Sequence, residues 1–177
     1  MATKLPEVKG KKVAVVGNAA SLLQQRHGSA IDECDVVVRM NRGLPREPSS
    51  QGTRTDILAF SVFEGVKDIY HLFKARYLMW MSPKSRDAAS GDFLFYDLNR
   101  WANLNALLGA RPSVGAMVLD FVSSLDPGGV EIYGFDFKRS LTHYQDRQHI
   151  GPHDFFAEER FCGDLARERN WSIVRDY

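Results

Sequence analysis

The stretch Val13-Ala14-Val15-Val16-Gly17-Asn18 decides the fold class, because it is a short, uninterrupted apolar run that stops at a glycine. Such a run is typical of a strand that is buried on both faces of a parallel sheet. Asp35-Val36-Val37-Val38-Arg39 repeats the pattern and ends at Met40-Asn41. The two stretches therefore predict two buried strands of one α/β fold.

Further apolar runs extend this pattern along the chain. Strands are expected at 56–60, 77–81, 93–96, 130–135 and 172–174. Helices are expected at 22–26, 62–73, 112–125 and 154–168, and a surface loop at 42–52. The alternation predicts an α/β, single-domain, Rossmann-like three-layer sandwich with a mostly parallel sheet over residues 1–177, in which residues 1–11 form a loose N-terminal arm.

Composition limits the classes of function. The chain has 177 residues, of which 44% are hydrophobic and 25% charged, so it is expected to form one globular domain. Lys and Arg total 23 and Asp and Glu total 22, which argues against a nucleic-acid surface. No apolar run approaches the roughly 20 residues of a membrane-spanning helix, so no integral membrane segment is expected. Two cysteines, Cys34 and Cys162, make no disulfide framework, which favours a cytoplasmic protein.

Several small polar segments follow the predicted strands. Gly17-Asn18 and Asn41 end the first two strands, and Gly134-Phe135-Asp136 ends a later one. Pro112-Ser113-Val114-Gly115 begins a helix, where backbone N–H groups favour an anion. Because parallel strands present ligands at their carboxyl ends, these segments predict a nucleotide site at one sheet edge. Taken alone, Gly17 favours a tight strand-to-helix turn and Ser113 favours a helix cap.

The loop from Lys138 to Pro152 and the residue that follows it hold three of the five histidines, which suit general base catalysis or phosphate binding. Glu158 follows His153 by five positions, so near a helix start its carboxylate is expected to reach back to the ring. Two other interpretations stay open: a capping arrangement with surface histidines, and a zinc site made of His143, Asp146, His149 and His153. The spacing matches no strong zinc pattern.

Arg39 lies at the end of the second predicted strand and has two interpretations. Its guanidinium would either point into the site and bind a carboxylate or phosphate, or form an ion pair at the strand end. The aromatic residues of the chain are expected to be mostly core, with one of them available to stack on a base or a sugar. They include Trp80, Phe93, Phe95, Tyr96 and Trp101.

Four motifs occur together in a characteristic order. Residues 13–19, 31–32 and 35–41, closed by Gly52-Thr53-Arg54-Thr55-Asp56, resemble the large sialylmotif of the sialyltransferases of glycosyltransferase family 29. Residues 112–115 with 130–135 resemble the small sialylmotif. His143-Tyr144-Gln145-Asp146 resembles the third motif, and His153 with Glu158 resembles the very small motif. The resemblance implies a compact bacterial or viral member with a sialyltransferase-type fold.

The sequence departs from the family pattern at several positions. Animal members carry a cysteine where this chain has Val13 and another in the small motif, so the resemblance implies that their disulfide is absent here. Val114 replaces a threonine, which removes a hydroxyl from the expected donor pocket. Gln145 and Asp146 stand where an aromatic residue and a glutamate are usual.

The resemblance also implies roles for individual residues. His153 would be the general base, with Glu158 beside it, and His143 with Tyr144 would stabilise charge on the departing phosphate. Asn18 and Asn41 would contact the nucleotide phosphate region. The remaining donor-binding residues implied are Gly17, Ala19, Ser113, Val114, Gly115, Tyr133, Gly134, Phe135 and Asp136.

The implied reaction moves an acidic sugar, sialic acid or Kdo, from its CMP ester to a hydroxyl of a glycan, with inversion. The implied partners are the CMP-sugar donor and an oligosaccharide, lipopolysaccharide or capsule acceptor. No cofactor and no metal are required, because phosphate is already a good leaving group. The expected location is the cytoplasm, either free or peripheral at the inner membrane. Three alternatives are a degenerate CMP-binding module, a metal-dependent hydrolase, and a glycosyltransferase that uses another nucleotide.

Overall fold

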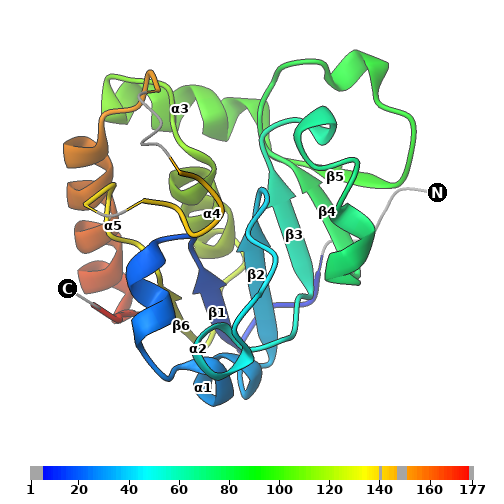
Figure 1. Cartoon of the computed structure of the whole chain (residues 1–177). Helices are drawn as coiled ribbons and strands as arrows, with labels where there is room; N and C mark the ends of the chain where they lie inside the picture. Colours follow the sequence, from blue (N-terminus) through cyan, green and yellow to red (C-terminus); the bar gives the residue numbers. More distant parts are fainter. Residues whose placement is uncertain (1–5, 140, 147–150, 176–177) are drawn as a thin grey trace.

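A computed structural model describes residues 6–139, 141–146 and 151–175 (Figure 1). Its centre is a seven-stranded sheet in the order β5-β4-β3-β2-β1-β6-β7, and every strand pair is parallel. The predicted α/β fold with a mostly parallel sheet is therefore confirmed. The strands are β1 Lys12–Val16, β2 Val36–Met40, β3 Ile57–Phe60, β4 Tyr77–Trp80, β5 Phe93–Phe95, β6 Gly129–Tyr133 and β7 Ser172–Ile173.

Helices cover both faces of the sheet and make the three layers. On one face, α3, α4 and α5 pack on Val13, Val15 and Val38. On the other face, η1 and α1 pack on Ala14 and Val16. The α-helices are α1 Gly28–Asp32, α2 Pro48–Gln51, α3 Leu98–Leu108, α4 Val114–Ser123 and α5 Phe155–Arg169. The 3-10 helices are η1 Ala20–Gln24, η2 Phe63–Gly65, η3 Tyr70–Phe73 and η4 Arg86–Ala88.

The central strands are apolar along their whole length because both of their faces are covered. Val13 and Val15 face the layer of α4, and Ala14 and Val16 face the opposite layer, as the two-residue period of a strand requires. All four side chains are almost completely buried. Each buried valine stabilises the fold by about 1.5–3 kcal/mol, so this continuous run is a strong determinant of the sheet.

The order of the strands reverses beside β1. From β1 the chain adds β2, β3, β4 and β5 on one side, and then returns to place β6 and β7 on the other side. In open α/β sheets a crevice forms at such a switch point, outside the carboxyl ends of the strands. Here the segments that follow β1, β2 and β6 and the start of α4 line a cavity at this point.

Helix α3 was not predicted, although both of its ends carry sequence signals. The Asp97 side chain accepts a hydrogen bond from the Arg100 N–H at 2.9 Å, which caps the start of the helix. Gly109 ends it with a φ of 67°, the left-handed conformation that glycine adopts without strain. Only Leu104 and Leu108 of this helix are buried, so its apolar pattern is weak.

The predicted helix at 62–73 is wrong, because this segment forms only the short 3-10 turns η2 and η3. Its side chains instead complete an aromatic cluster on β3 and β4, in which Phe63 packs against Phe60, Phe93 and Tyr70. The predicted loop at 42–52 also contains a turn of helix, α2, whose Ser50 and Gln51 are buried.

The described part of the N-terminal arm packs against the sheet domain. Val8 is buried, and Lys9 forms an antiparallel bridge with Pro127. The first part of the predicted arm, residues 1–5, lies outside the described residues. Among the residues that the structure describes, no helix is both long enough and apolar enough to cross a membrane.

Candidate active site

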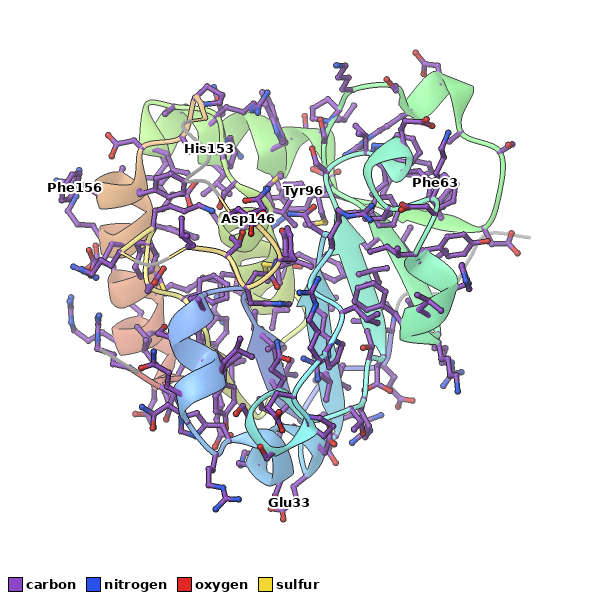
Figure 2. All side chains as sticks on the ribbon, in the orientation of Figure 1. Glu33, Phe63, Tyr96, Asp146, His153 and Phe156 are labelled. Atoms are coloured by element: carbon purple, nitrogen blue, oxygen red, sulfur yellow. The ribbon has the colours of Figure 1, made fainter. Side chains whose placement is uncertain are left out.

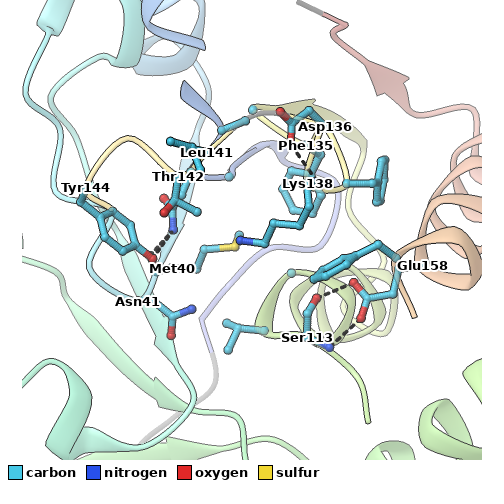
Figure 3. A pocket seen from close by; sticks show the side chains of 18 residues that line it. Met40, Asn41, Ser113, Phe135, Asp136, Lys138, Leu141, Thr142, Tyr144 and Glu158 are labelled. Carbon is cyan, nitrogen blue, oxygen red and sulfur yellow. Dashed lines mark hydrogen bonds between the residues drawn. The ribbon is translucent and has the colours of Figure 1, made fainter. Parts of the chain in front are cut away.

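Two adjoining cavities lie at the carboxyl ends of β1, β2 and β6. The first, here called the glycine cavity, has a volume of about 140 Å³ and contains Gly17 and Gly134 in its wall (Figure 3). The second, the histidine cavity, has a volume of about 290 Å³ and contains His153. They share one wall, made of Asn41, Ser113, Val114, Lys138, Thr142, Tyr144 and Phe155. The two cavities are therefore parts of one site.

Gly17 and Gly134 are glycines because the chain passes itself closely where β1 and β6 end. A Cβ atom on Gly17 would lie 2.4 Å from the Gly134 carbonyl oxygen. Gly134 has a φ of 65° and approaches the Gly17 carbonyl in return. The Gly17 N–H donates to the Tyr133 carbonyl at 2.7 Å, and the Ala19 N–H donates to Gly134 at 3.2 Å. These contacts hold the floor of the glycine cavity.

Asn18 and Asn41 are both wall residues, as expected, and both are fixed by hydrogen bonds. Asn18 Nδ2 donates to the Met40 carbonyl at 3.0 Å and to the Tyr144 hydroxyl at 3.4 Å. Asn41 has a φ of 51°, and its Oδ1 accepts from the Ser61 N–H at 3.2 Å. The amide nitrogen of Asn41 lies toward the middle of the cavity (Figure 3). The wall thus presents a fixed amide donor to a ligand.

Ser113 joins the start of α4 to α5. Its hydroxyl accepts from the Ala116 N–H at 3.2 Å, which caps the helix, and donates to Glu158 Oε2 at 2.6 Å. Its backbone N–H donates to Glu158 Oε1 at 2.7 Å. Glu158 is only 4% exposed, and this burial raises the pKa of its carboxyl, although the bonds from Ser113 oppose the shift.

The expectation that Glu158 reaches back to His153 needs correction, because the carboxylate is directed to Ser113. The reason is the position of Glu158 in α5. Asp154 caps that helix by accepting from the Ala157 N–H at 2.9 Å. Glu158 then lies one turn inside the helix, on the side that contacts the start of α4.

His153 lies in the wall of the histidine cavity together with Asn41 and Ser113, so the structure brings these three predicted residues together. Its Nδ1 is 2.6 Å from the Arg111 carbonyl oxygen. A carbonyl oxygen only accepts, so Nδ1 carries a proton in this contact, and in the neutral ring Nε2 is then the basic nitrogen. The ring packs beside Phe155, with centroids 5.8 Å apart. In Figure 2, His153 lies near the start of α5, at the opposite end of the molecule from Glu33.

His143 has an unusual environment outside both cavity walls. Both ring nitrogens are buried and have no hydrogen-bond partner among the described residues. Burial, assisted by the nearby charges of Arg46 and Arg39, lowers the pKa of the imidazole to about 4. The ring is therefore neutral at pH 7 and stands edge-on to Tyr144, with centroids 5.3 Å apart.

Two other expectations for the site need correction. Tyr133 is 2% exposed and belongs to the cluster of Ala14 and Val16 on the opposite face of the sheet, where its hydroxyl donates to Glu131 at 2.6 Å. Arg39 is also directed to that face, because it pairs in register with Val16. The neighbouring residue, Met40, reaches the glycine cavity instead.

Arg39 supports the scaffold and is not part of the cavity walls. Its Nε donates to the Arg54 carbonyl at 2.8 Å, and a terminal nitrogen donates to the Gln51 carbonyl at 2.6 Å. Burial lowers the pKa of its guanidinium to about 10, and the charge of Asp32 opposes this shift. The interpretation of Arg39 as an anion clamp is therefore wrong.

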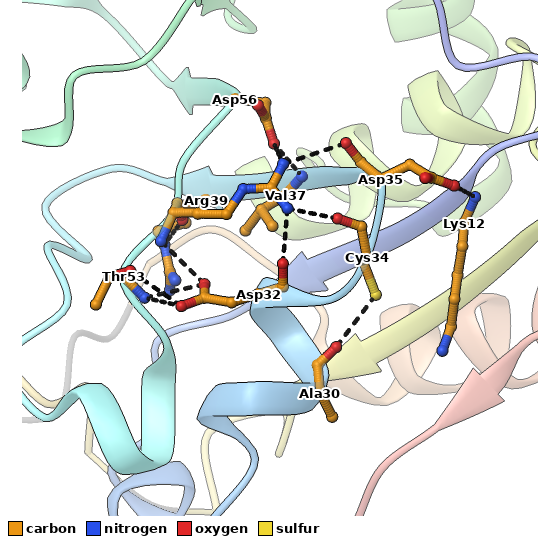
Figure 4. A network of polar contacts seen from close by, with 10 residues as sticks. Lys12, Ala30, Asp32, Cys34, Asp35, Val37, Arg39, Thr53 and Asp56 are labelled. Carbon is orange, nitrogen blue, oxygen red and sulfur yellow. Dashed lines mark hydrogen bonds and ion pairs between the residues drawn. The ribbon is translucent and has the colours of Figure 1, made fainter.

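The segment 52–56 is also structural (Figure 4). Asp32 accepts from the Thr53 hydroxyl at 2.9 Å and from the backbone N–H groups of Thr53 and Arg54. The Arg54 guanidinium donates to the carbonyls of Asp32 and Cys34, each at 2.7 Å. Asp56 accepts from the Val37 N–H at 2.8 Å. This network fastens the amino ends of β2 and β3.

Several residues of the two walls were not predicted from the sequence as site residues. Lys138 is the most informative of them, because a cation two positions after a strand-end segment is itself a signal of anion binding. Trp101 lies on the unpredicted helix α3. The other residues of this kind are Met40, Phe137, Leu141, Thr142 and Phe155 in the glycine cavity, and Ser61, Ser82, Arg111, Met117 and Gln145 in the histidine cavity.

The zinc interpretation of the histidines includes His149, which lies outside the described residues. Within residues 6–139, 141–146 and 151–175, no three His, Cys, Asp or Glu side chains are grouped so that they could hold a metal ion.

Comparison with known proteins agrees with the fold and the motifs. The profile of Glycosyltransferase family 29 (sialyltransferase) matches residues 2–84. A mammalian sialyltransferase structure superposes with a TM-score of 0.70 and 20% identity, over 93% of this chain and 69% of that chain. Cst-I, a monofunctional alpha-2,3-sialyltransferase from Campylobacter jejuni, superposes with a TM-score of 0.69 and 12% identity, over 98% and 79%. No curated protein matches the sequence.

CstII from Campylobacter jejuni, solved with the substrate analogue CMP-3FNeuAc, gives a TM-score of 0.66 at 14% identity over 93% of this chain and 80% of that chain. The parallel sheet, the switch point beside β1 and these superpositions show an α/β sandwich of the sialyltransferase fold. The family profile covers the region of the large motif, residues 2–84, and this match supports membership of glycosyltransferase family 29, which the motifs predicted.

Proposed function

We propose that the protein transfers an acidic sugar, sialic acid or the related Kdo, from its CMP ester to a hydroxyl group of a glycan. The observation that carries this proposal is the position of His153 in a cavity that shares Asn41 and Ser113 with the glycine cavity. The CMP-sugar donor would occupy the glycine cavity, and the acceptor hydroxyl would enter from the histidine cavity.

The glycine cavity has the donors that such a substrate needs. The backbone N–H groups of Val114 and Gly115 open a ten-residue helix, whose positive end attracts a phosphate or carboxylate. Gly115 leaves room for the Phe135 ring, because a Cβ atom there would lie 2.9 Å from it. CstII, a structure of similar fold, binds CMP and CMP-3FNeuAc, which supports the choice of nucleotide.

In the proposed reaction, the acceptor oxygen attacks the anomeric carbon of the donor sugar. The new C–O bond forms on one face while the bond from that carbon to the phosphate oxygen breaks on the other, so the configuration inverts. CMP leaves with the electron pair of the broken bond, and His153 Nε2 takes the acceptor proton. The hydrogen bond from Nδ1 to the Arg111 carbonyl supports this role, because it makes Nε2 the basic nitrogen of the neutral ring.

The remaining assignments follow from the same placement. Tyr144 lines both cavities, and its hydroxyl would donate a hydrogen bond to the departing phosphate. His143 would position Tyr144 through the edge-on contact of their rings, and its lowered pKa keeps the imidazole neutral at pH 7. CMP is a good leaving group, so the proposed reaction uses no metal. The glycan acceptor, an oligosaccharide, lipopolysaccharide or capsule chain, would be met in the cytoplasm or at the inner membrane.

A transfer assay in the presence of EDTA tests this function. Purified protein is mixed with CMP-sialic acid or CMP-Kdo and a panel of oligosaccharides that includes Gal-beta-1-3GalNAc, which a mammalian sialyltransferase was solved with. We expect one CMP released for each glycoside formed, with inverted anomeric configuration in the product by NMR. Binding of CMP without turnover would instead identify a degenerate binding module. Activity that EDTA removes and zinc restores would identify a metal-dependent enzyme.

A further inference from the structure

Lys138 is the one basic side chain among the described residues that line the glycine cavity. The side chain extends from the loop after β6 across the cavity, toward the Met40 side chain (Figure 3). Its Nζ lies 5.8 Å from the centre of the Phe155 ring. Lys138 also lines the histidine cavity, so this residue lies in the wall that the two cavities share.

The backbone that carries Lys138 is held in an uncommon conformation. Phe137 has a φ of 52° and Lys138 a φ of 67°, so two successive non-glycine residues are left-handed. Asp136, which is 5% exposed, fixes this turn. Its Oδ1 accepts from the Lys138 N–H at 3.1 Å, and its carbonyl accepts from the Arg139 N–H at 3.1 Å. Such strained positions persist where the surroundings enforce them, and they cluster at functional sites.

The electrostatic setting favours an anion beside this lysine. Burial lowers the pKa of the Lys138 ammonium, while the carboxylates of Asp136 and Glu158 oppose that shift. An ammonium group in the wall of a cavity binds an oxyanion more strongly than one in bulk water, because the charges are less screened there.

We infer that the Lys138 ammonium binds an oxyanion of the donor substrate at the junction of the two cavities, and that the left-handed turn at Phe137–Lys138 exists to hold it there. The oxyanion is either the nucleotide phosphate or the carboxylate of the sugar. This inference rests on the proposed function. If the phosphate is the partner, Lys138 also stabilises the charge that the phosphate gains as the glycosidic bond breaks.

Three substitutions separate the charge of Lys138 from its backbone conformation. Lys138→Met keeps the length of the side chain and removes the charge. Lys138→Gly removes the charge and the side chain but adopts a positive φ without strain. Lys138→Arg keeps the charge. Lys9→Met is the matched control, because Lys9 is exposed and lies at the opposite end of the sheet.

Calorimetric titration with CMP, cytidine and a non-hydrolysable CMP-sialic acid analogue distinguishes the two oxyanions. If the phosphate is the partner, Lys138→Met and Lys138→Gly bind CMP roughly 10- to 100-fold more weakly than the wild type. Cytidine, which has no phosphate, then binds all proteins within about threefold. If the carboxylate is the partner, only binding of the analogue weakens by that factor. In both cases Lys138→Arg and Lys9→Met stay close to the wild type.

Two results would overturn the inference, and they differ from failure of the proposed function. The oxyanion contact is excluded if Lys138→Met and Lys138→Gly bind both CMP and the analogue as tightly as the wild type does. Lower melting temperatures of both variants without ligand, at unchanged affinity, would make Lys138 a structural partner of Glu158. A wild-type protein that binds none of the three compounds would contradict the proposed function itself.

Discussion

The two ends of the parallel sheet use charged residues in different ways. At the amino ends of β2 and β3, Asp32, Arg54 and Asp56 are joined to the backbone by a set of short hydrogen bonds (Figure 4). At the carboxyl ends, burial raises the pKa of Glu158 and lowers the pKa of Lys138, and both residues line the glycine cavity. The charged network at the amino ends fastens the backbone, whereas the charged groups at the carboxyl ends lie where the proposed substrate would bind.

This contrast divides the motifs of the family by physical role. The large motif supplies Asn18 and Asn41 to the site, but its closing segment, 52–56, only fastens the scaffold. Residues of one motif therefore need not share a function. The following experiments test whether the division between a stabilising end and a reactive end is correct.

The largest effect is expected for His153→Ala at the reactive end. Removal of a general base lowers transfer by about 10²- to 10⁴-fold, while the affinity for CMP stays within about twofold, since the ring faces the histidine cavity. Transfer rates and calorimetric titration with CMP measure the two quantities. His71→Ala is the control, because His71 is exposed on η3. Equal loss of CMP binding in His153→Ala would make His153 a donor ligand and not the base.

Arg39→Met tests the stabilising side of the comparison. The carbonyls of Gln51 and Arg54 lose their buried donor, so the free energy of unfolding should fall by about 2–4 kcal/mol, with CMP affinity of the folded protein unchanged. Urea denaturation measures the change, and Arg26→Met, at an exposed arginine, should leave stability nearly constant. Unchanged stability together with lost CMP binding would restore the anion-clamp interpretation of Arg39.

The smallest effect concerns acid stability and His143. Its pKa is lowered to about 4 in the fold, whereas an unfolded histidine titrates near its usual value of about 6.5. Between these values the unfolded chain binds more protons, so stability must fall as the pH falls from about 6.5 to 4.

The loss from His143 should be on the order of 1–2 kcal/mol, once solvent screening of the half-buried ring is allowed for. His143→Phe keeps the aromatic shape without the proton site, so its free energy of unfolding should fall less over that pH range. Urea unfolding of both proteins at pH 4.5 and 7.5 measures the difference. Identical losses would show that the acid sensitivity lies elsewhere.

Much of the fold could be predicted because strand burial leaves a local trace. In a run such as Val36-Val37-Val38, successive side chains point to opposite faces, so all of them are buried only when both faces of the strand are covered. Helix α3 left a weaker trace, since it buries only Leu104 and Leu108 and its N-cap, Asp97, is a common loop residue. A helix was wrongly predicted at 62–73, because apolar residues that fill an aromatic cluster need not follow any fixed period.

The candidate site could be predicted only in part, because position at a strand end does not specify direction. Gly17, Asn41 and Gly134 lie at the cavity, as their positions after strands indicated. Tyr133 and Arg39 are equally close to strand ends, but the two-residue period directs them to the other face.

The sequence by itself predicted the family resemblance, the parallel sheet and the strand ends at which a ligand would be held, because these depend on local hydrophobic runs and on short motifs. Only the tertiary structure decided which partners the charged residues have. Glu158 is directed to Ser113, 45 residues away, and Lys138 enters the cavity from a left-handed turn. Hydrogen bonds and burial of this kind depend on packing between distant elements, which leaves no periodic pattern in the chain.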